Sequence, residues 1–141
     1  MTTRHRPRPR PAPRRPADDH GPPRTELVEG VATPVSRSWA HEAAIASLRR
    51  GLAARLAALG LVAGSGDLDL PGSANRYVPG LAVVPAGLAA STEGALLPHH
   101  TLLVVEVTSP STADSDRAVK RRRYGQYGTP LYLLVDRQSR T

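Results

Sequence analysis

The chain has 141 residues, no cysteine and a formal net charge of +7, and these properties already exclude several classes of protein. The length favours a single domain. Without cysteine there is no disulfide framework, no thiolate zinc site and no cysteine nucleophile. No apolar run approaches the roughly 18 residues of a membrane span, and the N-terminus lacks the apolar segment of a secretory signal. We therefore expect a cytoplasmic protein with no membrane partner.

The N-terminal segment is rich in arginine and proline. Residues 1–25 hold seven arginines, two aspartates and seven of the fourteen prolines, so they carry +5 of the net charge. Because proline interrupts helices and the segment has little apolar surface to bury, residues 1–24 are predicted to be a disordered tail. One domain, at residues 25–141, is expected to follow. The tail is either an electrostatic tether to nucleic acid or a solvated extension, and we favour the second.

Hydrophobic patterning predicts the first elements of the domain. Residues 27–31 read LVEGV, in which apolar residues flank a Glu-Gly turn, and this pattern is typical of a short hairpin. Apolar residues then recur at helical spacing between Ala44 and Leu59, with arginines on the opposite face. This repeat predicts an amphipathic helix that begins near Trp39 and stops at Gly60.

The rest of the domain is predicted to alternate strands and one further helix. The expected elements are, in chain order, a strand at 61–70, a turn at 71–75, a strand at 77–84 interrupted at Pro79-Gly80, a loop at 85–100, a strand at 101–107, a helix at 114–127 and a strand at 131–135. The segment 101–107 reads TLLVVEV, a nearly continuous apolar run of the kind buried on both faces. The order indicates an α/β (α+β) domain with a central sheet flanked by helices.

Glu106 is the most informative single residue, because every neighbour within its predicted strand is apolar. A buried carboxylate costs several kcal/mol unless it is paired, hydrogen-bonded or bound to a metal. Glu106 is therefore a candidate for a functional site. The alternative is that the strand ends early and Glu106 reaches solvent at the edge of the sheet.

Three polar residues follow at helical spacing. Asp116, Lys120 and Tyr124 are four positions apart and so lie on one face of the predicted helix. Lys120 is the only lysine beside eighteen arginines, which suggests a need for a compact ammonium in place of a guanidinium. The alternative is an ordinary surface pair between Asp116 and Lys120. We expect Lys120 and Glu106 to converge on one side of the sheet.

Several short strings resemble one known family. They are TELVEG, WAHEAAIASL, RYVPGLAVVP, LLVVEVTSPST, the spacing D-x-x-x-K-x-x-x-Y, and GTPLYLLVD. Together they cover about residues 25–136 and resemble the Uma-type restriction endonucleases, bacterial members of the PD-(D/E)XK nuclease superfamily. The resemblance implies a restriction-endonuclease-like αβββαβ core with a central mixed sheet.

The resemblance also implies a chemistry, namely metal-dependent hydrolysis of phosphodiester bonds in nucleic acid, above all DNA. By the family pattern, Glu106 is a catalytic metal ligand, Glu26 is a less secure second ligand, and Lys120 is the catalytic lysine, with Asp116 and Tyr124 in support. The implied cofactor is Mg²⁺ or Mn²⁺, which binds carboxylate oxygens, activates water and neutralises charge on the phosphate. A homodimer is left open.

The chain departs from the family pattern at two places. Gly80 stands where the family has its principal metal-binding aspartate, and glycine offers no side-chain ligand. Family members also continue with further strands beyond the last one here, so we expect a C-terminally truncated domain. Two functions are therefore possible. The chain is either an endonuclease that is impaired in this copy, or an inactive nuclease fold that binds only nucleic acid or a protein partner. Gly80→Asp is expected to improve metal binding.

Overall fold

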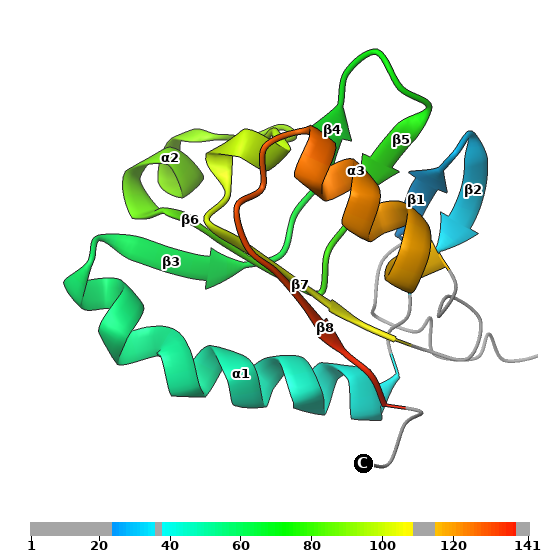
Figure 1. Cartoon of the computed structure of the whole chain (residues 1–141). Helices are drawn as coiled ribbons and strands as arrows, with labels where there is room; N and C mark the ends of the chain where they lie inside the picture. Colours follow the sequence, from blue (N-terminus) through cyan, green and yellow to red (C-terminus); the bar gives the residue numbers. More distant parts are fainter. Residues whose placement is uncertain (1–23, 36–37, 109–114, 138–141) are drawn as a thin grey trace, which may run out of the picture.

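The computed structural model describes residues 24–35, 38–108 and 115–137, and the predicted tail and the start of the second helix lie outside these residues. The described part contains two four-stranded sheets, with strand orders β2-β1-β5-β4 and β3-β6-β7-β8 (Figure 1). The strands of the first sheet are β1 (Thr25–Val28), β2 (Val31–Pro34), β4 (Leu68–Leu70) and β5 (Asn75–Tyr77). Those of the second are β3 (Leu61–Gly64), β6 (Leu81–Pro85), β7 (Leu103–Val107) and β8 (Tyr132–Val135).

The long helix α1 (Trp39–Ala58) covers one face of the second sheet. It begins where the Ser38 hydroxyl accepts a hydrogen bond from the His41 amide at 3.1 Å, an N-cap that satisfies one of the helix's free donors. Ile45 is buried against residues of β6 and β7, including Leu81 and Val105. The predicted apolar face of the helix is wrong at its C-terminal end. Leu59 lies after the last residue of the helix and is 67% exposed.

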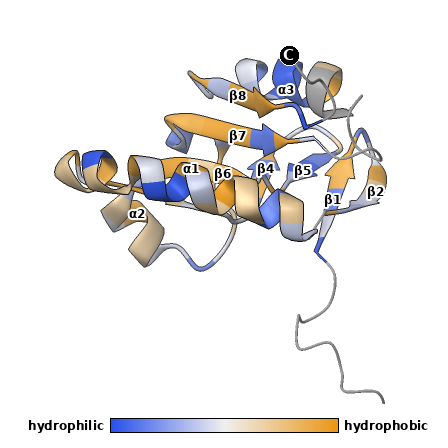
Figure 2. Cartoon of the chain, turned by 90° about the horizontal axis from the view of Figure 1, so that it is seen from below, coloured by the Kyte–Doolittle hydropathy of each residue, from blue (hydrophilic) through white to orange (hydrophobic). Residues whose placement is uncertain are grey.

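The opposite face of the second sheet packs against the first sheet and against α3 (Arg121–Gln126). Val104 of β7 and Tyr124 of α3 lie in one apolar cluster with Leu70 and Tyr77 of the first sheet. Figure 2 shows most of β7 and β8 in hydrophobic colours, as expected for strands inside this arrangement. The second sheet is therefore a middle layer, with α1 on one side and α3 and the first sheet on the other.

A tight hairpin positions the acidic residues of β1. Glu29 and Gly30 have positive φ angles of 49° and 82°, the backbone of a two-residue turn that suits the twist of paired strands. The amide of Gly30 donates to the Ala74 carbonyl at 2.7 Å and so ties the hairpin to the strand β5 region. The predicted hairpin is confirmed, and it holds Glu26 on the inner side of the sheet, 3% exposed.

The expected αβββαβ core is confirmed in the order α1, β3, β6, β7, α3 and β8. Strand β7 is antiparallel to β6 and parallel to β8, so the sheet is mixed. The other predicted helix begins in the described residues as a π-helix, η2 (Ser115–Lys120), and continues as α3. Two short helical segments, α2 (Ala86–Ser91) and η1 (Pro98–His100), lie in the predicted loop. Among the described residues, no helix has the length and apolar character to cross a membrane.

Two sequence-based boundaries are wrong. The segment 61–70 is not one strand but two, β3 and β4, which belong to different sheets because the chain breaks at 64–66, Gly-Ser-Gly. The turn predicted at 71–75 ends one residue sooner, since Asn75 starts β5 and pairs with Leu70. The predicted interruption at Pro79-Gly80 is confirmed, and it separates β5 of one sheet from β6 of the other.

Candidate functional site

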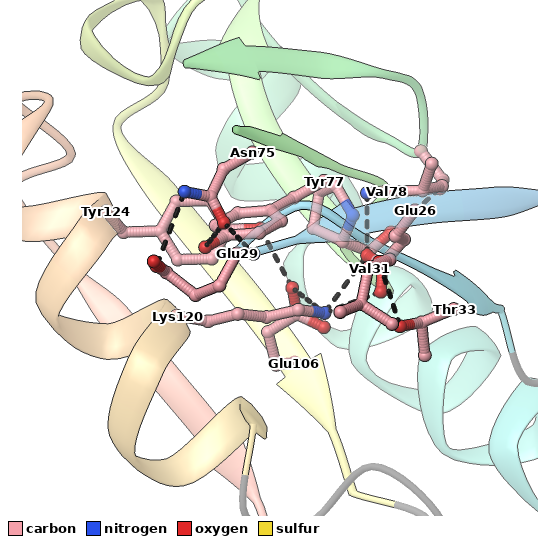
Figure 3. A network of polar contacts seen from close by, with 12 residues as sticks. Glu26, Glu29, Val31, Thr33, Asn75, Tyr77, Val78, Glu106, Lys120 and Tyr124 are labelled. Atoms are coloured by element: carbon pink, nitrogen blue, oxygen red, sulfur yellow. Dashed lines mark hydrogen bonds and ion pairs between the residues drawn. The ribbon is translucent and has the colours of Figure 1, made fainter. Parts of the chain in front are cut away.

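Three charged side chains from distant parts of the chain meet in the interior (Figure 3). The ammonium Nζ of Lys120 lies 3.0 and 2.9 Å from the two carboxylate oxygens of Glu26, and 3.4 Å from Oε1 of Glu106. Glu26, Glu106 and Lys120 are only 3%, 4% and 3% exposed. The predicted convergence of Glu106 and Lys120 is therefore confirmed. The alternatives of a solvent-exposed Glu106 and a surface Lys120 are wrong.

Two neutral groups also donate hydrogen bonds to the two carboxylates. The Tyr124 hydroxyl donates to Oε1 of Glu106 at 2.8 Å, and the backbone amide of Val78 donates to Oε1 of Glu26 at 2.7 Å. Nζ of Lys120 also lies 5.3 Å from the centroid of the Tyr77 ring, within the range of a cation–π contact. Buried charges are tolerated when they are paired and hydrogen-bonded in this way.

The buried tyrosines remain neutral near pH 7. Burial raises the pKa of the Tyr124 hydroxyl well above its ordinary value, and the negative charge of Glu106 raises it further. Burial likewise raises the pKa of Tyr77, with a smaller contribution from the charge of Glu29. Tyr124 can therefore act as a hydrogen-bond donor to Glu106 but is a poor proton acceptor.

A second polar group lies at the edge of this cluster and includes Glu29 of the first hairpin. The Arg123 guanidinium donates to both oxygens of Glu29, at 2.7 and 2.9 Å, and this contact holds the pKa of the Glu29 carboxyl below its usual value. The Asn75 side-chain oxygen accepts from the Glu29 amide and from the Tyr77 hydroxyl, both at 2.8 Å. Asn75 thus links the hairpin turn to the buried tyrosine. A buried asparagine has no distinctive spacing in a sequence, so the sequence pattern predicts only a turn at Asn75.

One predicted site residue, Asp116, is not tested by the structure, and a further acidic residue, Asp67, lies outside the cluster. The Asp116 side chain lies outside the described part of the structure, so its supporting role stays a prediction. Asp67, on the segment between β3 and β4, pairs with Arg76 at 2.7 Å, where both side chains are partly exposed. It is therefore engaged outside the buried cluster.

Gly80 lies next to the cluster but faces a different neighbour. Leu81 of β6 pairs with Val105 of β7, so extending the register by one residue places Gly80 opposite Glu106. A β-carbon at position 80 would lie 2.7 Å from the Ile45 Cδ1 atom and 3.3 Å from the Val105 carbonyl oxygen. The space that an aspartate would use is therefore filled by the terminal methyl of Ile45, on the α1 side of the sheet.

The described residues do not fit a divalent cation as they stand. Mg²⁺ prefers an octahedron of oxygen ligands, and Ca²⁺ binds six to eight oxygen ligands. The described residues contain no group of three or more His, Asp or Glu side chains that could hold a metal ion. The space between the carboxylates of Glu26 and Glu106 is taken by the Lys120 ammonium. Position 80 supplies no ligand. Two carboxylates and one ammonium leave a formal charge of −1, which the Tyr124 hydroxyl and the Val78 amide stabilise by hydrogen bonds.

The mixed sheet, its flanking helices and the buried Glu–Lys cluster define a nuclease-like fold. A solved structure with this fold is a protein described as a "putative nuclease belonging to DUF820" from Anabaena variabilis, which this chain matches with a TM-score of 0.57 at 19% identity. The match covers 81% of this chain and 66% of that one, so this chain spans just under two thirds of its length.

The family is shown by the sequence itself. The model of the family Uma2, "Putative restriction endonuclease", matches residues 13–141, and the chain belongs to this family. No curated protein matches the chain. Families with a restriction-endonuclease-like fold generally use divalent metals, which makes the ligand set described above a departure that needs a functional explanation.

Proposed function

We propose that this chain is a nucleic-acid-binding member of the nuclease family in which cation-dependent cleavage is impaired. One observation carries the proposal, namely that the Lys120 ammonium lies between the carboxylates of Glu26 and Glu106 and is hydrogen-bonded to both. A divalent cation at this place would have to displace a buried ammonium that already pairs with both carboxylates. It would also find no third carboxylate at Gly80.

The proposed partner is DNA, which the family and the charge of the chain both favour. Arg121 and Arg122 are exposed at the start of α3, directly after Lys120. The N-terminal 25 residues add +5 to the chain. Cationic side chains bind phosphates without regard to sequence, and such binding weakens steeply as salt is added. We therefore expect binding that depends on salt but not on Mg²⁺ or Mn²⁺.

The competing function is endonuclease activity with Mg²⁺ or Mn²⁺ held by Glu106 and Glu26. It is favoured by the family match and by the presence of both carboxylates beside Lys120. The two functions differ in a measurable way, because only the endonuclease needs the cation to bind at Glu106.

A cleavage assay separates them. Wild-type protein and Glu106→Gln would be compared for nicking of supercoiled plasmid with Mg²⁺ and Mn²⁺, and for DNA binding by fluorescence anisotropy with and without metal. We expect binding by both proteins and nicking by neither. Strong metal-dependent nicking by the wild type that Glu106→Gln abolishes would contradict the proposal and establish the endonuclease.

The role of position 80 can be tested with a matched pair of variants. Ile45→Val removes the methyl group that occupies the space beside Gly80, so Gly80→Asp is best made in that background. Gly80→Ala with Ile45→Val is the control, since it fills the same space without a carboxylate. We expect tighter Mn²⁺ binding by calorimetry for the aspartate variant alone. Equal Mn²⁺ affinities of the aspartate and alanine variants would show that a carboxylate at position 80 does not contribute a metal ligand.

A further inference from the structure

A cavity of about 590 Å³ lies between the first turns of α1 and the segment that joins β5 to β6. Val78, Pro79 and Gly80 line one wall of the cavity, and Val78 and Pro79 are buried. The backbone amide of Val78 donates a hydrogen bond to Glu26 of the Glu–Lys cluster. The segment that forms this wall of the cavity therefore also contacts the cluster. The volume of the cavity falls in the range of sites that hold small organic ligands.

The rim of the cavity carries the only tryptophan of the chain. Trp39 lines the cavity, yet 93% of its surface is exposed. A large aromatic side chain is seldom left so open in a folded domain, because its burial is one of the strongest sources of stability. An exposed ring beside a cavity is well suited to stack against a flat ligand.

The charged residues of the rim suit a ligand that is anionic at one end and has N–H donors at the other. The guanidinium groups of Arg24 and Arg49 line the cavity and are both exposed, and guanidinium binds phosphate oxygens in pairs. The Glu42 carboxylate, also on the rim, accepts hydrogen bonds from N–H groups but repels a bare phosphate. A nucleotide combines these features, since it has a flat base with N–H donors and a phosphate on each side.

We propose that this cavity binds one unpaired nucleotide of a single-stranded nucleic acid, with its base against Trp39 and its flanking phosphates on Arg24 and Arg49. A base inside a duplex is stacked on both faces, so it cannot reach the indole without being flipped out. The proposal rests on the proposed function, and it narrows the partner from nucleic acid in general to a strand with unpaired bases. Val78, whose amide donates to Glu26, lies in the wall of the same cavity.

The single tryptophan makes the cavity directly observable. Emission of Trp39 in the full chain would be followed during titration with oligo(dT), with oligo(U), with a duplex of equal length and with an abasic strand of equal length. We expect quenching by the single strands and little by the duplex or the abasic strand, which offers phosphates without bases. Equal quenching by the abasic strand would overturn the proposal.

Variants at the rim give a second measurement. Trp39→Leu should weaken binding of labelled oligo(dT) in anisotropy roughly 5- to 150-fold, the range for loss of one base–aromatic stack, whereas Trp39→Phe should retain most of the affinity. Arg49→Ala should weaken binding more than Arg50→Ala, its neighbour on α1, which is equally exposed but does not line the cavity. All variants are compared by circular dichroism to establish that they fold.

The outcomes distinguish this inference from the proposed function. If the chain binds single strands but Trp39→Leu and Arg49→Ala bind as tightly as the wild type, the cavity is not the site, while nucleic-acid binding itself stands. If the wild type binds neither duplex nor single strands, both proposals fail together. Quenching by single strands that is lost on Arg49→Ala but not on Arg50→Ala would support the site as described.

Discussion

Replacement of Lys120 by methionine tests the electrostatics of the buried cluster. Methionine keeps most of the length and apolar volume of lysine but removes the ammonium, so Glu26 and Glu106 lose their shared cation. All three residues are at most 4% exposed, so water cannot replace the lost contacts without opening the core. Breaking a buried ion pair by removing one partner typically costs about 3–5 kcal/mol.

That loss is large beside the total stability of a domain, which is typically about 5–15 kcal/mol. For a chain of this size it corresponds to a fall in Tm of roughly 10–20 °C. Urea unfolding followed by far-ultraviolet circular dichroism is the suitable assay, because the exposed Trp39 is a poor reporter of burial. In mildly acidic buffer the loss should shrink, since protons can then neutralise the stranded carboxylates.

Two controls sharpen the experiment. Adding Glu26→Gln to Lys120→Met should recover part of the lost stability, because one unpaired charge is removed along with its partner. Arg123→Met breaks the exposed pair with Glu29 and should cost much less, since exposed pairs are screened by water. A loss below about 1 kcal/mol for Lys120→Met, similar to that for Arg123→Met, would refute the description of Lys120 as the buried counter-charge.

Four further predictions concern the cluster and the tail. Tyr124→Phe should lower the free energy of unfolding by about 1–3 kcal/mol in chemical denaturation, because it leaves a buried oxygen of Glu106 without its donor. In alkaline titration, phenolate absorbance should show Tyr77 and Tyr124 ionising later than unfolded tyrosine; their raised pKa means that they contribute stability below pH about 10 and lose it as the pH rises further. Deletion of residues 1–23, which keeps Arg24, should leave the Tm nearly unchanged but reduce salt-sensitive DNA binding in anisotropy. Addition of EDTA to the purified wild type should not change its Tm in a thermal scan.

Much of the core was predictable because its signals are local. A helical repeat predicted α1, and an apolar run predicted β7. Both signals depend only on residues that are close together in the chain. The carboxylate of Glu106 inside such a run required a buried partner, and a lone lysine on the following helix was the natural candidate. A crossover helix after a strand packs back on the same sheet, so this pair was expected to meet, and the structure places Nζ 3.4 Å from Oε1.

The features that sequence reasoning missed all depend on contacts between distant segments. Membership of β3 and β4 in different sheets is decided by long-range pairing, which leaves no trace in the residues of 61–70 themselves. Asn75 looked like a turn residue because asparagine is common in turns, and its role appears only when the hairpin turn at Glu29 lies against it. Trp39 marked the start of the predicted helix, but the helical repeat did not indicate that its side chain is exposed.

Gly80 shows how one missing side chain changes the meaning of several others. If an aspartate stood there, its β-carbon would face Ile45 on the α1 side of the sheet, and its carboxylate would join Glu26 and Glu106 only if that methyl group moved. With glycine, no third carboxylate is added, and the contacts of Glu26 and Glu106 include the Lys120 ammonium, the Tyr124 hydroxyl and the Val78 amide. The charge of Lys120 is covalently attached and needs no dissolved ion, so the two buried glutamates keep one counter-charge without a metal. A glycine at position 80 and a lysine paired with both glutamates are therefore consistent parts of one arrangement.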